Sequence, residues 1–119
     1  MADSAALLPK KNYATQPCPM TDFVSLISGK WAIPILYRLI VLNTAVRFSE
    51  LQRAVSPITQ KELTRQLRLF EQRGLVSRQV YPEVPPRVEY CITPLGLTLR
   101  GALDPLAEWM HNHGDKLKR

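Results

Sequence analysis

The chain has 119 residues, a formal net charge of +6 and a sequence pI near 9.7. This length suits one domain with a modest core and argues against a deep catalytic cleft with its own lid. The positive charge favours a polyanionic partner, nucleic acid before an anionic membrane, and the hydrophobic share of 45% argues against wholesale disorder.

The N-terminal third predicts a tail and two helices. Residues 1–16 are polar and lack periodicity, so we expect a flexible tail there. Thr21 or Asp22 can cap a short helix, which Gly29 ends. The very apolar run over residues 30–42 predicts a helix that forms the buried spine of the domain.

Two further helices are predicted in the middle of the chain. The first begins near Phe48 and stops at Pro57. Thr59 then caps a helix over about 60–73, with Glu62 at the spacing of a capping box. Its buried stripe is formed by apolar residues at helical spacing, namely Leu63, Leu67 and Phe70.

A β-hairpin follows, with strands over about 76–81 and 87–93. Its tip, at about 81–88, is rich in proline, which has no N–H for a strand ladder and must therefore lie in the turn. Alternation is imperfect on the first strand, because Arg78 shares a face with apolar neighbours.

Thr93 and Pro94 predict the N-cap and first residue of one long helix over about 94–113. Pro105 should kink this helix near Gly101. Its apolar stripe is wider than so small a core needs, which predicts packing against a second copy of the chain. The residues expected at this dimer interface are Leu99, Leu103, Leu106, Trp109 and Met110.

This order of elements predicts an α+β, mostly α fold: a winged helix-turn-helix with a C-terminal dimerisation helix. We expect one domain over residues 17–113, which includes that helix at about 94–113. Residues 114–119 would form a basic C-terminal tail.

The predicted 60–73 helix carries polar side chains on its outer arc, namely Gln60, Lys61, Thr64, Arg65 and Arg68. Such a helix fits the major groove of DNA, where glutamine can pair with adenine and arginine or lysine with guanine. The alternative is a solvated face with salt bridges to Glu62 and Glu71. The order of helix, hairpin and final helix favours DNA contact.

Two other candidate DNA-binding residues each have a structural alternative. Arg87 can enter the minor groove or meet phosphate from the hairpin, or it can pair with Glu83 or Glu89. Ser49 can donate to phosphate from the start of its helix, or it can be a plain N-cap.

Two cysteines without CxxC spacing argue against a structural zinc site and a disulfide framework. Cys18 precedes the first helix, whose N-terminus lowers a thiol's pKa, so it is either a redox-sensing thiolate or an unreactive, partly buried residue. Cys91 is either a partner for the Cys18 thiol across a dimer or a residue with no part in thiol chemistry. His111 and His113 lack a further ligand at suitable spacing, so no metal site is expected.

Catalytic and membrane signals are weak in this sequence. We find no nucleophile–base pair, paired carboxylates, metal cluster or glycine-rich phosphate loop, so we expect neither an enzyme nor a cofactor. No apolar run approaches the roughly 18–20 residues of a bilayer span, and no signal peptide is recognised. We therefore expect a soluble, cytoplasmic protein.

Several segments resemble a known family when taken together and in order. They are Cys18-Pro19, Gly29-Lys30-Trp31, Arg47 to Leu51, Leu63 to Leu67, Glu71 with Gly74-Leu75-Val76, Tyr81 to Tyr90 and Thr93 to Gly96. They resemble the HxlR-type winged-helix transcription regulators, which are MarR-like bacterial proteins. Departures at Pro34, Arg73 and Asn43-Thr44-Ala45-Val46 affect local packing or add charge.

The resemblance implies a homodimer that binds a near-palindromic operator in double-stranded DNA. The second helix of the motif and the wing would make the contacts. Several members of the family sense oxidants or electrophiles through the cysteine at the position of Cys18, so a small-molecule or oxidant effector stays open. The competing function is a winged-helix module that docks an acidic protein without specific DNA readout. Steep salt dependence with a palindromic preference would distinguish the two.

Overall fold

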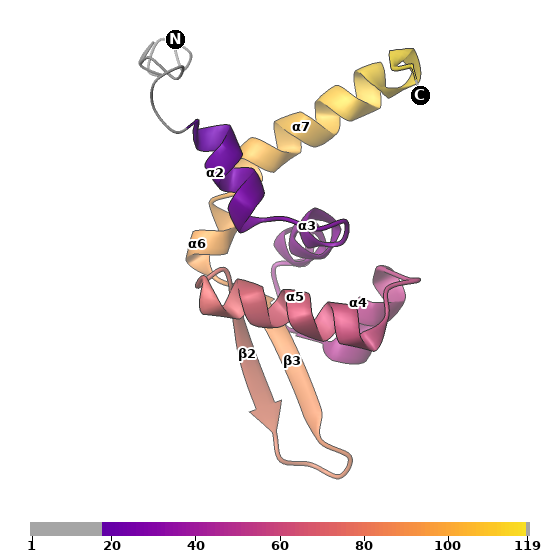
Figure 1. Ribbon diagram of the computed structural model, residues 1–119. Helices are drawn as coiled ribbons and strands as arrows, with labels where there is room; N and C mark the ends of the chain where they lie inside the picture. Colours follow the sequence, from indigo (N-terminus) through magenta and orange to yellow (C-terminus); the bar gives the residue numbers. More distant parts are fainter. Residues whose placement is uncertain (1–17, 119) are drawn as a thin grey trace.

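The computed structural model describes residues 18–118, so the tail expected at 1–16 lies outside the described part. The helices are α2 (Pro19–Leu26), α3 (Ala32–Leu42), α4 (Phe48–Ala54), α5 (Gln60–Gln72), α6 (Pro94–Leu97) and α7 (Arg100–His113). The strands are β1 (Val46–Arg47), β2 (Val76–Tyr81) and β3 (Arg87–Ile92), and a 3-10 turn, η1 (Gly114–Lys116), follows α7. Figure 1 shows a mostly helical body from which the hairpin and α7 project, so the predicted fold class is confirmed.

Helix α2 begins earlier than the sequence predicted. Cys18 is its N-cap and Pro19 its first residue, so neither Thr21 nor Asp22 caps it. Proline suits the first helical position because its φ is fixed near the helical value and its N–H is not needed there. The N–H of Asp22 donates to the carbonyl oxygen of Cys18 at 3.0 Å and closes the first turn.

Helix α3 is the buried spine of the domain, as predicted. Its inward residues, Ala32, Ile35, Leu36, Leu39 and Ile40, are fully buried. The helix begins at Ala32, so Pro34 lies in the first turn, where its missing N–H has no partner to lose. Asn43 ends the helix in the left-handed conformation, with φ at 48°.

The three strands form an antiparallel sheet in the order β1–β3–β2. The hairpin register runs from Val76 opposite Ile92 to Tyr81 opposite Arg87, and the prolines lie in the connection, as predicted. Strand β1 was not predicted, because two residues are too few to show alternation. It extends the sheet by pairing Val46 with Tyr90.

The hairpin leaves the body of the domain along its length. Val76, at its base, is 2% exposed, whereas Val80 on the same face is 42% exposed. The distal half of that face is therefore free to line a surface rather than a core. Figure 1 shows the tip extending well beyond α4 and α5.

The predicted single helix over 94–113 is wrong, because the chain breaks it at Thr98 and Leu99. Both residues keep helical dihedral angles, but their N–H groups make tighter i→i+3 bonds, at 3.1 Å, to the carbonyl groups of Leu95 and Gly96. The N–H of Thr98 is shared with the carbonyl of Pro94 at 3.3 Å. Pro105 lies inside α7, which continues across it as one helix.

Close packing holds α6 against the base of the hairpin. Thr93 caps α6 as predicted, accepting the N–H of Gly96 at 3.1 Å and donating its hydroxyl to the carbonyl of Gly74 at 2.6 Å. A Cβ on Gly96 would lie 2.6 Å from Cδ1 of Ile92 and closer still to the carbonyl oxygen of Leu75. This turn is thus pinned to the base of the hairpin, and α7 leaves in another direction (Figure 1).

Candidate nucleic-acid interface

Helix α5 presents one apolar and one polar face. Thr59 is its N-cap and accepts the N–H of Glu62 at 3.1 Å, as the sequence predicted. The predicted stripe of Leu63, Leu67 and Phe70 is buried. On the opposite arc Gln60, Lys61, Arg65 and Arg68 are exposed and Thr64 is half-buried.

Gln66 is a buried polar residue of α5 that the sequence-based prediction missed. It is 3% exposed, and its Nε2 donates to the carbonyl oxygen of Ser28 at 3.5 Å. Gly29 next to it has φ at +110°, and a Cβ there would lie only 2.8 Å from Nε2 of Gln66. The contact ties the middle of α5 to the α2–α3 connection and so fixes how the outer arc is presented.

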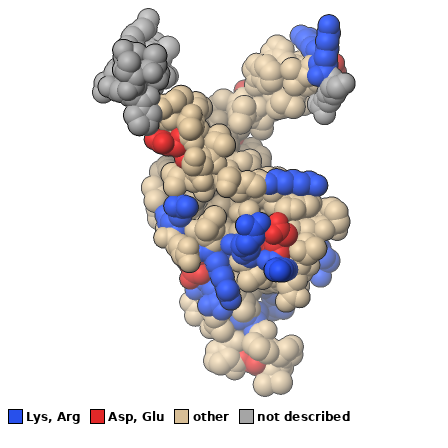
Figure 2. Space-filling view, viewed as in Figure 1, with Lys and Arg blue, Asp and Glu red and all other residues tan. Residues whose placement is uncertain are grey.

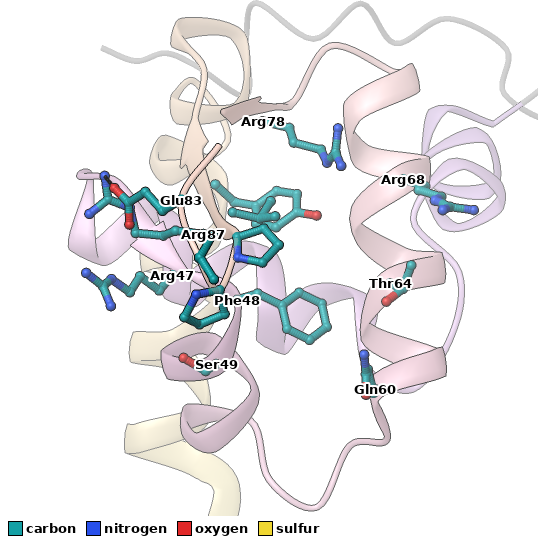
Figure 3. Close-up of a pocket in the computed structure, with 14 residues that line it drawn as sticks. Arg47, Phe48, Ser49, Gln60, Thr64, Arg68, Arg78, Glu83 and Arg87 are labelled. Carbon is teal, nitrogen blue, oxygen red and sulfur yellow. Dashed lines mark ion pairs between the residues drawn. The ribbon is translucent and has the colours of Figure 1, made fainter. Parts of the chain in front are cut away.

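A groove of about 590 Å³ runs between α5, the start of α4 and the hairpin. We call it the α5–hairpin groove. It is lined by Arg47, Phe48, Ser49, Gln60, Thr64, Arg68, Arg78, Glu83, Val84, Pro85, Pro86, Arg87, Val88 and Tyr90. In Figure 3, Arg78 extends from the hairpin toward α5, on which Gln60, Thr64 and Arg68 lie in a row. The groove thus brings together five predicted site residues from three elements: Ser49, Gln60, Thr64, Arg68 and Arg87.

Arg47 and Arg78 also line this groove and were not among the predicted site residues. The imperfect alternation of the first strand was the available signal for Arg78. An arginine on the inner face is costly in a core but favourable on a groove that meets solvent. Arg47 precedes α4 and points to the side, away from α5, in Figure 3.

Arg65 is engaged within α5. Its guanidinium donates to both carboxylate oxygens of Glu62, with N–O distances of 2.8–3.1 Å. Both side chains are exposed, so the pair contributes little to stability. This salt-bridged arrangement is the alternative considered for the outer arc, and among residues 18–118 no ion pair involves Lys61 or Arg68.

Arg87 is held by its own hairpin. Its guanidinium lies 3.1 Å from a carboxylate oxygen of Glu83 and 3.4 Å from one of Glu89. The guanidinium carbon also lies 4.0 Å from the ring centre of Tyr81, a cation–π contact. The geometry to Glu89 is that of an ion pair without a hydrogen bond, since Nε of Arg87 has no acceptor. The structure therefore favours the pairing alternative for this residue.

Ser49 is not the N-cap of its helix, so that alternative is wrong. The N-cap of α4 is Arg47, whose N–H donates to a carboxylate oxygen of Glu50 at 3.2 Å. The helix begins at Phe48, one residue before Ser49 and directly after β1. The exposed Ser49 side chain is one of those that line the α5–hairpin groove (Figure 3).

The charge distribution around α5 is mixed but mainly positive. Figure 2 shows Lys and Arg side chains gathered over the face that α5 occupies, with a few acidic groups among them. The hairpin tip below shows mostly uncharged side chains and one acidic group, and its Val84 is 99% exposed. A polyanion can therefore approach α5 favourably, while the tip offers an apolar surface.

Cys18 is a half-buried free thiol at the N-cap of α2. The backbone N–H groups of Thr21 and Met20 lower the pKa of the Cys18 thiol below its ordinary value, against the opposing effects of desolvation and of Asp22. Cys91 is also free and half-buried, on the strand face opposite to its buried neighbours Tyr90 and Ile92.

The residues expected at a dimer interface divide into two groups. Leu103 is 6% exposed and belongs to the core of its own chain, and Leu99 packs against that core. The direction of α7 leaves the others outside, with Leu106 at 57%, Trp109 at 47% and Met110 at 43% exposed. Only the second group is free for contact with another chain.

Metal ligation and membrane insertion find no support in the described residues. Within 18–118, no three His, Cys, Asp or Glu side chains lie close enough together to hold a metal ion. The ring of His113 instead lies 5.2 Å from that of Trp109. No helix in the same range has the length and apolar character needed to cross a bilayer.

Comparisons with known proteins agree on one family. A family model described as HxlR-like helix-turn-helix matches residues 26–118. An HTH-type transcriptional regulator from Methanothermobacter thermautotrophicus is 46% identical over 97 residues, which make up 82% of this chain and 72% of the relative.

Two solved structures extend this likeness to the fold. The redox regulator HypR in its reduced form has a TM-score of 0.74 and 39% identity, covering 82% of this chain and 95% of that one. The reduced transcriptional regulator YodB from B. subtilis has a TM-score of 0.65 and 32% identity, covering 78% and 90%. The chain thus belongs to the HxlR-like helix-turn-helix family of DNA-binding transcriptional regulators, which are not enzymes, and it has the winged-helix fold of MarR-like proteins.

Proposed function

We propose that the chain acts as a homodimer that binds a near-palindromic operator in double-stranded DNA. Helix α5 enters the major groove, and the wing, residues 81–88, lies on the flanking backbone or minor groove. The observation that carries this proposal is the α5–hairpin groove, where polar side chains of α5 face Arg78 across a space open to solvent. DNA has the charge and the grooved shape that such a surface can hold.

We assign the roles of the residues around the groove according to which side chains already form ion pairs within the protein. Gln60, Thr64 and Arg68 read base edges, because they lie in a row on the exposed arc of α5. Arg78 and Ser49 hold phosphates on either side and set the register. Lys61 and Arg65 act at the edge of the contact, Arg65 with its charge partly offset by Glu62.

Arg87 takes a different part in the proposal. Its pairing with Glu83 and Glu89 and its contact with Tyr81 fix the shape of the wing. The nearly uncharged wing tip then meets sugar edges in the minor groove through Val84, as apolar side chains do in other minor-groove contacts.

The exposed part of α7 provides the dimer contact in this proposal. Leu106, Trp109 and Met110 would be a contiguous apolar surface in a monomer, and burying it against the same surface of a second copy satisfies twofold symmetry. Two α5 helices related by this axis would read the two halves of the operator.

A thiol response through Cys18 completes the proposal. The pKa of Cys18 is lowered, and the thiolate is the form that oxidants attack. The chain is similar to HypR, a redox regulator solved in its reduced form. It is also similar to YodB, a transcriptional regulator solved in reduced and diamide-treated forms. Oxidation at the start of α2 would alter how α2 packs beside Thr98 and Leu99, from which α7 leaves, and so the dimer.

Selection of genomic fragments tests the proposal and does not require the operator sequence in advance. The purified protein should enrich fragments that share one near-palindromic motif, and the Arg68→Ala variant should enrich it far less. Enrichment without any common motif would contradict specific readout and leave the protein-docking function in its place.

A further inference from the structure

The core domain and α7 are joined by a polar contact that the DNA-binding surface does not use. Tyr37 of α3 donates its hydroxyl to Oδ1 of Asp104 in α7, at 2.6 Å. The other oxygen of Asp104 accepts from Nε of Arg100 at 3.0 Å, within the same helix. Both carboxylate oxygens are thus engaged, one across the helix–helix junction and one along α7.

This contact lies where α7 leaves the body. Leu103, the neighbour of Asp104, is the only residue of α7 among the buried core residues in the described chain. Beyond it the apolar side chains are exposed, and Figure 1 shows α7 extending away from the other helices. The direction of α7 therefore depends on roughly one helical turn, fixed by Leu103 through packing and by Asp104 through hydrogen bonds.

The break between α6 and α7 makes the turn at Leu103 and Asp104 more important for the direction of α7. Thr98 and Leu99 separate α7 from α6, so the rigid attachment of α6 to the hairpin is not passed on through a continuous helix. Pro105 follows Asp104 directly and removes the backbone bond that would otherwise stiffen the same turn.

The protonation states favour a persistent contact. Hydrogen bonds from Tyr37 and Arg100 lower the pKa of the Asp104 carboxyl, and the bond to Asp104 raises the pKa of the Tyr37 hydroxyl. At neutral pH the carboxylate is ionised and the phenol keeps the proton that it donates. Such a charge-assisted bond is directional as well as strong.

We propose that Tyr37 and Asp104 are positioning residues that set the direction of α7 and thereby the operator half-site spacing that the dimer accepts. This inference rests on the proposed function, because it needs α7 to form the dimer and α5 to read DNA. From Asp104 to its end at His113, α7 rises roughly 14 Å at 1.5 Å per residue. A change of about 15° at the turn of Asp104 moves the far end by about 3–4 Å, close to the ~3.4 Å rise of one base pair.

Two variants weaken the contact between the helices, and a third separates it from the ion pair within α7. Tyr37→Phe and Asp104→Asn weaken or remove it with almost no change in volume. Arg100→Gln removes the ion pair within α7 and leaves the Tyr37 bond in place, so it serves as the matched control. Thermal unfolding and sedimentation of each variant establish that it is folded and dimeric before DNA is added.

The first readout is the dependence of affinity on spacing. Operators with one base pair inserted or deleted at the centre are compared with the parent. We expect the wild-type protein and Arg100→Gln to bind the parent at least tenfold more tightly, and Tyr37→Phe and Asp104→Asn to reduce that ratio to below about threefold. Equal ratios in all four proteins would overturn the inference.

The second readout needs no DNA. Spin labels at Gln72→Cys, at the end of α5, report the α5–α5 distance in a dimer of a Cys18→Ser, Cys91→Ser background. A narrow distance distribution that broadens or shifts with Tyr37→Phe supports the inference, and an unchanged one contradicts it. Failure of the wild-type protein to bind any operator would instead defeat the proposed function, and this inference with it.

Discussion

Arg65 and Glu62 form a two-pronged ion pair on the outward face of α5, with the shortest N–O distance at 2.8 Å. The pair lies one helical turn from Arg68, for which the described residues supply no acidic partner. Two arginines on the same arc therefore differ in how much free charge they offer to DNA. This difference gives an ordering of mutational effects that a plain count of cations would not give.

Replacing Arg68 with alanine should weaken operator binding by about 1–3 kcal/mol, roughly 5- to 150-fold. Arg65→Ala should also weaken binding, but less, because its charge is partly offset. Glu62→Gln should tighten binding, since it frees Arg65 and removes a negative charge from the interface. Anisotropy titrations check the ordering, with the exposed α3 variant Arg38→Ala as the control. Unchanged affinity of the Arg68→Ala variant for the operator would contradict the assignment of Arg68 as a DNA-contacting residue.

Replacing Thr59 with alanine should destabilise the protein by about 1 kcal/mol, because the N–H of Glu62 loses its cap. Thr59→Ser keeps the hydroxyl and should retain most of that stability. Urea unfolding of the two variants measures the difference. Equal midpoints for Thr59→Ala and the wild-type protein would show that the cap contributes nothing.

The stability of the protein should depend on Asp104 in acid. Its carboxyl pKa is lowered on folding, first by Tyr37 and then by Arg100. The stabilisation is therefore present above the pKa of the unfolded state, about 4, and is lost as pH falls through the lower folded value. The stability gap between wild type and Asp104→Asn should be widest above about pH 5 and shrink toward pH 2. A gap independent of pH would contradict this linkage.

Leu106→Glu should convert the dimer to a monomer, because it places a charge in the apolar surface of α7. Glu108→Gln serves as the control, because it changes a charge on the same helix and leaves the apolar residues Leu106, Trp109 and Met110 unchanged. Sedimentation velocity distinguishes the two states. Retention of a dimer by Leu106→Glu would exclude this face as the interface.

Cys18 should react with iodoacetamide at a lower pH than a free cysteine does, because its pKa is lowered. Diamide should release the wild-type protein from DNA by oxidising the two Cys18 thiols of the dimer, one from each protomer, to a disulfide, while diamide takes up both hydrogens and is reduced to a hydrazine. Cys18→Ser should remain bound, whereas Cys91→Ser should behave as the wild-type protein. Release of Cys18→Ser by diamide would show that another group is the sensor.

Much of the fold was predictable because local signals and packing agree. The spacing of Leu63, Leu67 and Phe70, the cap at Thr59 and the prolines of the hairpin tip each point to one structure, and the protein adopts it. The family resemblance was confirmed as well. The residues on the outer arc of α5 could be predicted because they lie opposite the buried stripe of the same helix.

The misses are places where tertiary contacts override a local pattern. Strand β1 forms through the pairing of Val46 with Tyr90, which lies far along the chain. The break at Thr98 directly follows the turn in which Gly96 closely approaches Ile92, and no periodicity reveals that approach. Arg78 joins the candidate site because the hairpin projects past the core, and its position on an apolar face was the one hint.

The most direct test of the central claim is fluorescence anisotropy of the purified protein against its own upstream DNA across a salt series. We predict tight binding that exceeds binding to a scrambled duplex and falls steeply with salt, with a slope reduced by about one in an Arg78→Ala variant. Equal, weak binding to both duplexes at every salt concentration would contradict specific recognition of that DNA through the α5–hairpin groove.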